Sequence, residues 1–439
     1  RESVRFRRSG TPHAPISYQP YDDGQNPARV SISAFTIIEP GINGAGIWER
    51  HHGPIFKIQL TPEYGLGLGK SSILINGTPQ KIARWPDAPV AYDFDWNGMA
   101  SPQRATHDPS SAGPEPPYEG TFHTATYEDP ALPNGAFNGW QGARIDTSPG
   151  GGVFRDTGIV TQSAESSVTF RYRPFPKPGA YAAKDDPYFL WNHLNALDQE
   201  GEYFFDIEGV SGPAYTLYLF PPGNTPPDQT TVEIRSREYG FDLNWTSHIH
   251  LKGLHFIGGG IECPVSSSSI LMDDLHLRYC GSGLDTLQTG RAAIWLKGDG
   301  HKLLNSQIEY SYGGGVITLG TNTEIANNVI RNCMLYGVAS FDSSDIHAHH
   351  NTIFENQGVN IHMYSPRGRF NYNHCYHAGK RVTDSASMNS NYNGDLQEME
   401  VAYNWVHSNG ARFNLARTEE NGASRPIWGG GRGIRMDTS

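Results

Sequence analysis

Short apolar runs alternate with polar residues along much of this chain, in a pattern typical of β-strands. The stretch EIANNVIRNC, residues 324–333, alternates in this way and carries two adjacent asparagines in its middle. Similar stretches recur as AHHNTIFENQ from residue 348, FNYNHCYHAG from 370 and VAYNWVHSNG from 401. Runs of Val, Ile, Tyr, Phe and Thr that are broken by Gly, Asn and Pro predict an all-β protein.

The recurring stretches are regularly spaced. When each is aligned on the apolar residue that closes it, successive anchors lie 21, 31, 22, 23, 23 and 30 residues apart. A base period near 22 residues indicates a solenoid, and three short strands plus turns fill one period. We therefore predict a right-handed parallel β-helix over residues 247–437, with coils about 4.8 Å apart. The anchors are Phe256, Leu277, Ile308, Ile330, Ile353, Tyr376 and Val406.

Polar residues that precede the anchors predict a ladder at one turn of the coil. Asn tolerates the left-handed backbone that such a turn needs. Its amide can also hydrogen-bond to the equivalent amide of the next coil. We assign turn or ladder roles, rather than metal binding, to His349, His350 and His374. The predicted ladder column, two positions before each anchor, is Asn328, Asn351, His374 and Asn404.

The 22-residue pattern is absent from the middle of the chain. We predict a first β-helix segment over residues 1–44, an inserted β-sandwich-like module over 45–240 and β-helix coils over 241–439. We expect the chain to continue beyond both ends. The module contains strand-like pieces such as IFKIQL, SSILING, SSVTFRYRP, GEYFFDIE and YTLYLFPP. Residues 100–135, dense in Pro, Ser, Thr and His, are expected to form a long loop.

Charge and cysteine content narrow the classes of function. The net charge of -11 argues against a nucleic-acid partner, because general nucleic-acid binders are usually basic. No stretch approaches the roughly 20 apolar residues that span a bilayer, so we expect no membrane partner. The four cysteines have no CxxC spacing, and we predict buried free thiols rather than a zinc site or a disulfide framework.

Several stretches resemble the secreted right-handed β-helix proteins of bacteria. They are SGTPHAPISYQPYDDGQNPARVSIS, ILINGTPQKIARWPD, LNALDQEGEYFFD, TLYLFPPG and SHIHLKGLHFIGG. Many such proteins are glycoside hydrolases with a β-sandwich-like module inserted in the first coils. Polysaccharide lyases of the alginate lyase and chondroitinase B type share the β-helix but usually lack the ARWPD insertion. The resemblance implies a secreted protein with a polysaccharide as substrate. It favours a hydrolase over a lyase, but it identifies no catalytic residue in this chain.

One carboxylate interrupts an apolar column. A lone buried Asp costs several kcal/mol unless it is paired, and such departures are expected at functional sites. The alternative is a shift in register that leaves Asp384 in a solvated loop. A hydrolase needs two carboxyl groups, and we predict Asp384 paired with Asp437, with Asp395 in reserve. The column, eight positions after successive anchors, is Val316, Val338, Ile361 and Asp384.

The neighbouring column carries groups that suit a lyase. Alternation turns its side chains outward, where an ordinary polar face is the alternative reading. A lyase needs a base and a cation that neutralises the uronate carboxylate, with calcium as a candidate cofactor. We expect no cofactor for a hydrolase. The column reads Ile317, Ala339, His362 and Ser385, extended by Arg435 when GIRMD is aligned with GVASF. The lyase groups are His362, Tyr364, Lys380, Arg381 and Arg435.

The stretch GARFNLARTEENGASRPIWGGGRGIR, residues 410–435, is rich in Arg. Arg recognises carboxylate or sulfate, and aromatic rings stack on sugar faces, so an anionic glycan fits despite the acidic chain. Pairing of these arginines with Glu419 and Glu420 is the alternative. A non-catalytic glycan-binding β-helix also remains open. The predicted substrate-binding residues are Arg435, Arg432, Arg412, Trp428, Lys380 and Arg381.

Overall fold

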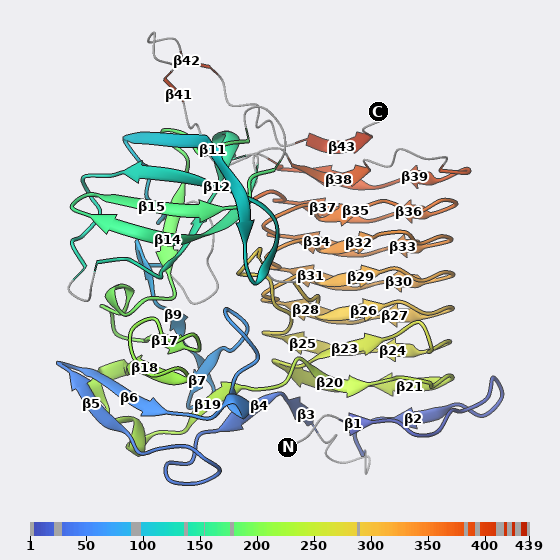
Figure 1. Ribbon diagram of the computed structural model, residues 1–439. Coiled ribbons are helices and arrows are strands. Elements are labelled where there is room, and N and C mark those ends of the chain that lie inside the picture. The colour runs from blue at the N-terminus through green and yellow to red at the C-terminus, as the bar shows by residue number, and fades with distance from the viewer. Residues whose placement is uncertain are drawn as a thin grey trace.

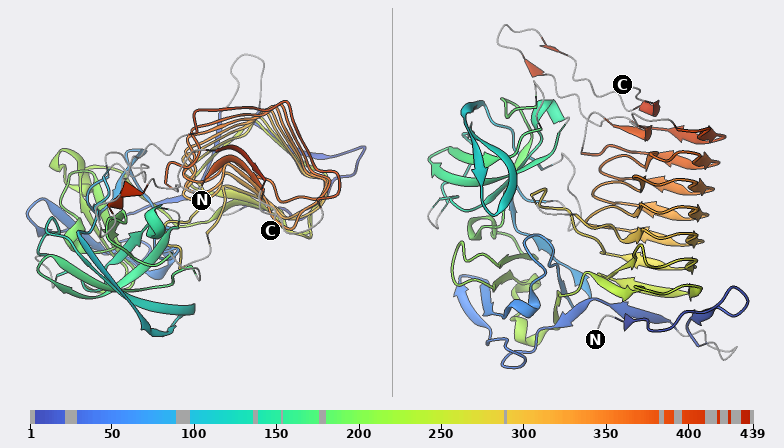
Figure 2. Two further views of the ribbon diagram at one scale, coloured as in Figure 1. Left: turned by 90° about the horizontal axis from the view of Figure 1, so that it is seen from above. Right: turned by 45° about the vertical axis from the view of Figure 1, so that its right-hand side comes forward.

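The computed structural model describes residues 4–21, 29–88, 98–135, 139–152, 154–175, 180–287, 290–381, 385–390, 396–409, 417–418, 424–425 and 432–436. Three parallel sheets wind into a β-helix, and further sheets, largely antiparallel, form a second body beside it (Figure 1). Seen from above, the coils superpose as a stack and the second body lies along one side of it (Figure 2). The predicted all-β class, a β-helix with an additional module, is confirmed.

Each coil contributes one strand to each sheet, and we name the sheets I, II and III in chain order. Sheet I consists of β1 (Val4–Arg5), β20 (Tyr239–Asp242), β23 (Gly260–Cys263), β26 (Ile294–Leu296), β29 (Val316–Thr318), β32 (Val338–Ser340), β35 (Ile361–His362), β38 (Ala386–Ser390) and β43 (Arg432–Met436). Sheet II consists of β2 (Ile16–Tyr18), β21 (Ile249–Lys252), β24 (Leu271–Asp273), β27 (Lys302–Leu304), β30 (Glu324–Ala326), β33 (His347–His349), β36 (Arg369–Asn371) and β39 (Glu400–Ala402). Sheet III consists of β3 (Val30–Ser33), β22 (Leu254–Ile257), β25 (His276–Arg278), β28 (Gln307–Glu309), β31 (Val329–Arg331), β34 (Thr352–Phe354), β37 (His374–Tyr376) and β40 (Trp405–His407).

The anchor column of the sequence repeat is the inward-facing column of sheet III, with one correction. Cys375, not Tyr376, pairs with Ile353 on one side and Val406 on the other. Cys375 is fully buried. The ring of Tyr376 instead stacks on that of Phe354, with centroids 4.7 Å apart, on the outer face. The small thiol therefore occupies the core position, and the large ring lies outside it.

This shift of one residue changes the ladder. Asn373, not His374, stands between Asn351 and Asn404. Asn328 Nδ2 donates to Asn351 Oδ1 at 2.9 Å, and Asn351 Nδ2 donates to Asn373 Oδ1 at 3.0 Å. Asn373 Nδ2 donates to Asn404 Oδ1 at 3.1 Å, so the ladder spans four coils. His374 lies in β37 opposite Thr352, and its ring stacks on Trp405 with centroids 4.2 Å apart.

The residue before each ladder amide adopts the left-handed conformation that the sequence predicted for this turn. Its φ is 57° at Asn327, 55° at His350, 55° at Tyr372 and 58° at Tyr403. His349 hydrogen-bonds to His350 through their Nδ1 atoms at 2.8 Å, beside this turn. The histidine pair thus lies at the turn between sheets II and III.

Strands β4 to β19 belong to separate sheets, and we call residues 35–235 the inserted module. One sheet has seven strands in the order β10 (Arg84–Trp85), β16 (Tyr188–Trp191), β13 (Arg144–Thr147), β14 (Asp156–Ala164), β15 (Ser167–Tyr172), β12 (Tyr118–Glu128) and β11 (Arg104–Glu115). A second has five, β5 (Glu49–His52), β6 (Ile55–Gln59), β18 (Thr216–Phe220), β17 (Glu202–Asp206) and β9 (Lys81–Ile82). A third has four, β4 (Phe35–Ile37), β19 (Val232–Arg235), β7 (Ile73–Ile75) and β8 (Thr78–Pro79). The short helices are η1 (Pro62–Tyr64), α1 (Pro149–Gly152), η2 (Leu194–Ala196), η3 (Pro222–Asn224) and η4 (Pro227–Gln229), and β41 (Arg417–Thr418) pairs with β42 (Ser424–Arg425) near the C-terminus.

Each of the five strand-like pieces read from the sequence contains a strand, but the expectation of a long loop over residues 100–135 is wrong. Strands β11 and β12 form a long antiparallel hairpin there. The pairing is irregular between Asp108 and Glu115, where the register shifts twice. Prolines are tolerated at such irregularities and on an edge strand, and β11 is the edge of its sheet. The predicted domain boundaries at residues 45 and 240 stay a prediction.

The four cysteines are free and buried, as predicted. They belong to the β-helix core together with Leu, Ile, Val and Met side chains from all three sheets. Among the described residues, no helix is long and apolar enough to cross a membrane.

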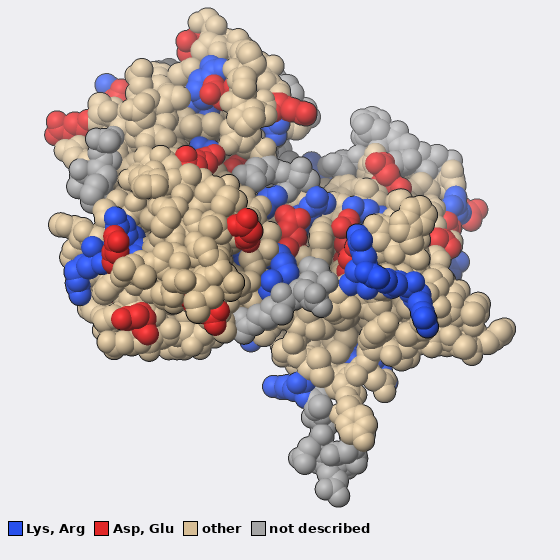
Figure 3. All heavy atoms as spheres, turned by 60° about the horizontal axis from the view of Figure 1, so that its bottom comes forward, with Lys and Arg blue, Asp and Glu red and all other residues tan. Residues whose placement is uncertain are grey.

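The inserted module docks against the β-helix through polar contacts. Arg155 of the module donates through Nη1 to the carbonyl of Gly283 at 2.8 Å. Thr157 and Thr286 exchange two hydrogen bonds of 2.8 and 3.0 Å, each from backbone N–H to side-chain hydroxyl. Lys70 forms an ion pair of 3.3 Å with Glu238, and acidic and basic side chains lie close together where the two bodies meet (Figure 3). These contacts fix the module against one side of the coils.

Candidate functional site

A cavity of about 230 Å³ lies where the inserted module meets the outer face of sheet I. Arg155 contributes the module side, and the coils contribute the rest. Polar and apolar groups alternate around the wall, as in sites that bind small polar ligands. The described lining residues are Arg155, Met334, Leu335, Tyr336, Gln357, Gly358, Val359, His362, Arg381, Ser385 and Asn389.

The outward column of sheet I places two of these residues side by side. His362 pairs with Asn389, and Asn389 pairs with Arg435. The sequence predicted His362 and Arg435 in one column, and the pairing confirms this. It predicted Ser385 between them, which is wrong. Ser385 precedes β38 and lines the cavity from there.

The inward column of sheet I also differs from its prediction. Met388, not Asp384, follows Ile361 and pairs with Ile434. Met388 is fully buried, so the apolar column continues without interruption. The register shifts because 27 residues separate Ile361 from Met388, whereas 22 and 23 separate the earlier members. Asp384 therefore does not break this column, and Asp384 itself lies outside the described residues.

The imidazole of His362 lies among aromatic rings on the cavity wall. Its centroid is 4.8 Å from that of Phe341, 5.5 Å from that of Tyr336 and 6.1 Å from that of Tyr364. Its Nδ1 lies 3.4 Å from the carbonyl oxygen of Ser340, which requires Nδ1 to carry the proton in that contact. Such a tautomer leaves Nε2 as the basic nitrogen.

A buried carboxylate joins two arginines at the cavity. Asp146, in β13 of the module, accepts from Arg155 Nη2 at 3.0 Å through Oδ2 and from Arg381 Nη2 through Oδ1. Arg381 belongs to the β-helix and is almost fully buried. Burial first, and the neighbouring Arg155 second, lower the pKa of Arg381. Because one carboxylate faces two guanidinium groups, this wall of the cavity favours an additional negative charge.

Several buried polar atoms of the cavity lining have no hydrogen-bond partner among the residues that the structure describes. They are Nε and Nη1 of Arg381, Oε1 of Gln357 and Oδ1 of Asn389. Buried polar groups in proteins are normally paired, and an unpaired one costs about 1–3 kcal/mol. The lining therefore offers donors and acceptors together, as a ligand rich in hydroxyl groups requires.

A second module carboxylate lies beside this arrangement. Asp156, the neighbour of Arg155 in sequence, has a buried Oδ2 with no hydrogen-bond partner among the described residues. Burial, followed by the nearby charge of Asp146, raises the pKa of Asp156 to about 7. A carboxyl group with that pKa can hold or release a proton near neutral pH.

The remaining predicted site residues occupy different positions. Tyr364 is half-buried next to the cavity histidine, and Lys380 forms an ion pair with Glu355. Arg432 is exposed on β43 opposite Ala386. Asp384, Asp395, Arg412, Trp428 and Asp437 lie outside the described residues.

Sequence reasoning missed the contribution of the inserted module to the cavity. Arg155 and Asp146 lie at least 179 residues before the cavity-lining groups of the coils, and no motif marks them. Gln357 and Asn389 were missed because they look like ordinary turn and strand residues. These side chains come together at one cavity only because the module docks against the coils.

The comparisons with known proteins agree with this architecture. A family model for the right-handed β-helix region matches residues 259–436. A solved structure described as "Glycoside hydrolase" is similar with a TM-score of 0.62 and 15% identity, over 93% of this chain and 78% of that one. Another, "The complex structure of XylC with xylose", has a TM-score of 0.45 and 12% identity, over 92% of this chain and 57% of that one. A search of curated proteins found no match. The resemblance to right-handed β-helix proteins is thus confirmed, at the level of the fold.

Proposed function

We propose that this protein is an extracellular carbohydrate-active enzyme, a glycoside hydrolase that cleaves a polysaccharide whose sugar residue occupies the cavity between sheet I and the inserted module. The observation that carries the proposal is the set of unpaired polar atoms on Arg381, Gln357 and Asn389 that line this cavity. At about 230 Å³ the cavity is smaller than the roughly 300–1,000 Å³ of typical small-molecule sites, so it takes one sugar residue rather than a long segment.

The chemistry of the lining suits a sugar. Hydroxyl groups donate and accept at once, and the lining supplies N–H donors from Arg381 and carbonyl acceptors from Gln357 and Asn389. Tyr336 adds an aromatic ring to the same wall. When Asp156 is protonated, the excess positive charge of Arg155 and Arg381 over Asp146 favours a sugar that bears a carboxylate or sulfate.

Hydrolysis requires two carboxyl groups near the bound sugar. We propose Asp384 with Asp437, because each lies within two residues of one of the last two strands of sheet I, and we keep Asp395 in reserve. Asp384 directly precedes Ser385, a lining residue, and Asp437 follows Met436, the last residue of β43. One carboxyl would protonate the leaving oxygen, while the other would act as nucleophile or general base. The similar structure described as a glycoside hydrolase supports this choice of reaction.

A polysaccharide lyase is the second candidate, and one observation favours it. The described lining contains His362 and Arg381 but no Asp or Glu. A neutral imidazole could abstract the proton next to a uronate carboxylate, which Arg381 would neutralise. In this alternative His362 is the base, and Tyr364 the proton donor beside it.

A screen of plant and algal polysaccharides separates these reactions. The full chain is incubated with each polymer, and reducing ends and ultraviolet absorbance are followed together. New reducing ends without absorbance support the hydrolase. Absorbance from unsaturated products supports the lyase, and binding without either product would contradict both and support a glycan-binding β-helix.

A further inference from the structure

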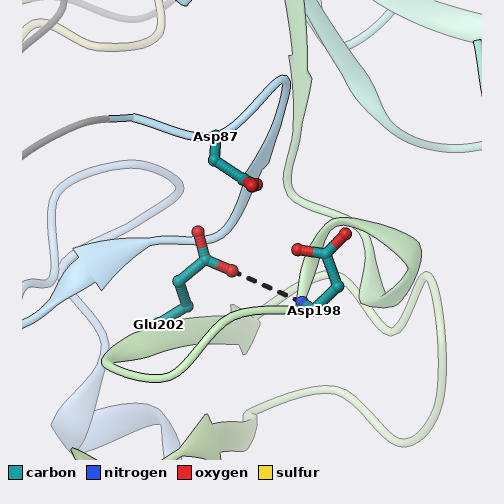
Figure 4. A group of neighbouring side chains, drawn as sticks. All are labelled: Asp87, Asp198 and Glu202. Carbon is teal, nitrogen blue, oxygen red and sulfur yellow. Dashed lines mark hydrogen bonds between the residues drawn. The ribbon is translucent and has the colours of Figure 1, made fainter. Parts of the chain in front are cut away.

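The inserted module contains three carboxylates that converge away from the cavity lining. Asp87 follows β10, Asp198 follows η2, and Glu202 is the first residue of β17. One oxygen from each lies within 4.8 Å of the corresponding oxygens of the other two. Figure 4 shows the three side chains pointing towards a common space, with Asp87 on one segment and with Asp198 and Glu202 together on another. Like charges at this separation repel, and burial together with the neighbouring Asp87 raises the pKa of Glu202 to about 8, so a proton or a bound cation must offset the repulsion.

Glu202 shows that the contacts within the protein do not complete this cluster. Its side chain is fully buried. Oε2 accepts from the backbone N–H groups of Gln199 at 3.2 Å and Asp198 at 3.4 Å. Oε1 is buried and has no hydrogen-bond partner within the described part of the chain. A buried carboxylate oxygen without a donor is costly, and this one faces two further carboxylates.

We propose that Asp87, Asp198 and Glu202 bind one divalent cation, with calcium preferred. All three ligands are carboxylate oxygens, which hard cations prefer, whereas zinc sites are built mainly from Cys and His. Two oxygens bound to the same calcium at about 2.3–2.6 Å can lie up to about 5 Å apart, and the observed separations fit within that limit. Asp198 is exposed, so water can complete the coordination from that side.

The position of the site gives it a structural role. The chain passes from β9 in the five-stranded sheet to β10 in the seven-stranded sheet directly before Asp87. It passes back from β16 through η2 to β17, and Asp198 and Glu202 lie on that return. A cation bound here would join both crossings between the two sheets. It would stabilise the module without contacting the cavity lining, so this inference does not depend on the proposed catalytic activity.

Calorimetry on the full chain tests the proposal. The protein is treated with EDTA, dialysed and titrated with CaCl₂, MgCl₂ or ZnCl₂. Its thermal unfolding is measured with and without each salt. We expect one calcium per chain, a weaker response to magnesium, and a Tm that rises by at least about 3 °C at saturating calcium.

Two ligand variants and one control make the test specific. Glu202→Gln and Asp198→Asn should each weaken calcium binding at least about tenfold and lose most of the Tm increase. Asp228→Asn, an exposed carboxylate in η4 of the same module, should respond like the wild type. If Glu202→Gln does not fold, Asp198→Asn decides, because its side chain is exposed. Absence of calcium binding in the wild type, or an unchanged response in the ligand variants, would overturn the proposal.

Discussion

The β-helix and the inserted module bury polar groups in different ways. In the coils, the amides of Asn328, Asn351 and Asn373 each donate to the next coil, so neutral groups satisfy one another. In the module, the buried groups include ionisable side chains such as Asp146 and Glu202. A repeat can supply a polar group such as the Asn amide with a copy of itself at the coil spacing, whereas the aperiodic module must provide a different partner for each polar group. Unsatisfied polar atoms therefore mark places where chemistry or binding can occur.

The cavity lies where the β-helix meets the inserted module. Sheet I provides a regular outward column with His362 and Asn389, and the module provides Arg155 and Asp146. Neither region alone forms the site. Predictions that separate the two regions therefore test the account.

The largest expected effect concerns the proposed catalytic carboxylate. Asp384→Asn keeps the size of the side chain but removes its charge and its transferable proton. General acid–base catalysis contributes about 10²–10⁴-fold, and loss of a nucleophile costs more. The variant should fold and bind glycan but lose at least that factor in kcat, with Asp228→Asn as the control. Near-normal turnover would remove Asp384 from the mechanism.

If Asp384→Asn keeps its activity, His362 decides between the two enzyme classes. Loss of unsaturated products in His362→Ala, measured by ultraviolet absorbance, would move the assignment to a lyase. If Asp384→Asn and His362→Ala both keep forming product, the reaction takes place elsewhere on the protein.

A next, smaller effect tests the register of the ladder. Asn373→Leu removes the side-chain hydrogen bonds with Asn351 and Asn404, together with the bond that Asn373 Oδ1 accepts from the Asn351 backbone N–H and the bond that Nδ2 donates to the Ala348 carbonyl. We expect a loss of about 1–3 kcal/mol in the free energy of unfolding, or more if both neighbours lose their partners. His374→Leu, one residue later, changes only a half-buried outer position and should cost less. Urea unfolding of the two variants compares them directly, and a larger loss for His374→Leu would contradict the ladder.

Asn351→Leu extends this test to the neighbouring coil. Asn351 Nδ2 also donates to the carbonyl of Ile325 at 2.8 Å, so the replacement of Asn351 removes that hydrogen bond as well. We expect about 1–3 kcal/mol of destabilisation and no change in glycan affinity, because the ladder is remote from the cavity lining. A change in affinity without loss of stability would show that the coils and the cavity are coupled.

A pH-dependent effect of similar size is expected from Asp156. Its pKa of about 7 in the folded protein exceeds the value near 3.9 of an unfolded Asp. The folded state therefore holds a proton that the unfolded state releases, and stability falls as pH rises from about 4 to 7. Asp156→Asn removes this loss. The free energy of unfolding of the variant minus that of the wild type should therefore rise by about 1–3 kcal/mol from pH 5 to pH 8. If the free energies of unfolding of the two proteins change equally with pH, that result would contradict the raised pKa of Asp156.

The sequence predicted the parts of the fold that depend on contacts between neighbouring coils. The period, the parallel sheets and the turn conformation follow from a pattern repeated about every 22 residues. The one-residue error arose in NYNHCYH, where Cys375 and Tyr376 are both acceptable apolar anchors and only the width of the core decides between them. The additional residues before β38 displaced the expected position of Asp384 in the same way.

The candidate site was predictable only on the side of the β-helix. His362 and Arg381 were identified from the sequence, and both line the cavity. Arg155 and Asp146 could not be identified, because their proximity to the coils depends on how an aperiodic module docks. The acidic cluster of Asp87, Asp198 and Glu202 has the same origin, since two segments of the module that lie more than 100 residues apart in the sequence form it.

The proposed function requires a sugar residue to bind in the cavity between sheet I and the module. Gln357→Ala is the variant to compare, because Gln357 lines the cavity and its Oε1 has no hydrogen-bond partner among the described residues. Isothermal titration with the oligosaccharide that the wild type binds best should show a Kd raised about 5–100-fold, which corresponds to one lost hydrogen bond of about 1–3 kcal/mol. Gln307→Ala, an exposed glutamine of sheet III, should leave Kd within about twofold. Equal affinities for wild type and both variants would contradict the claim.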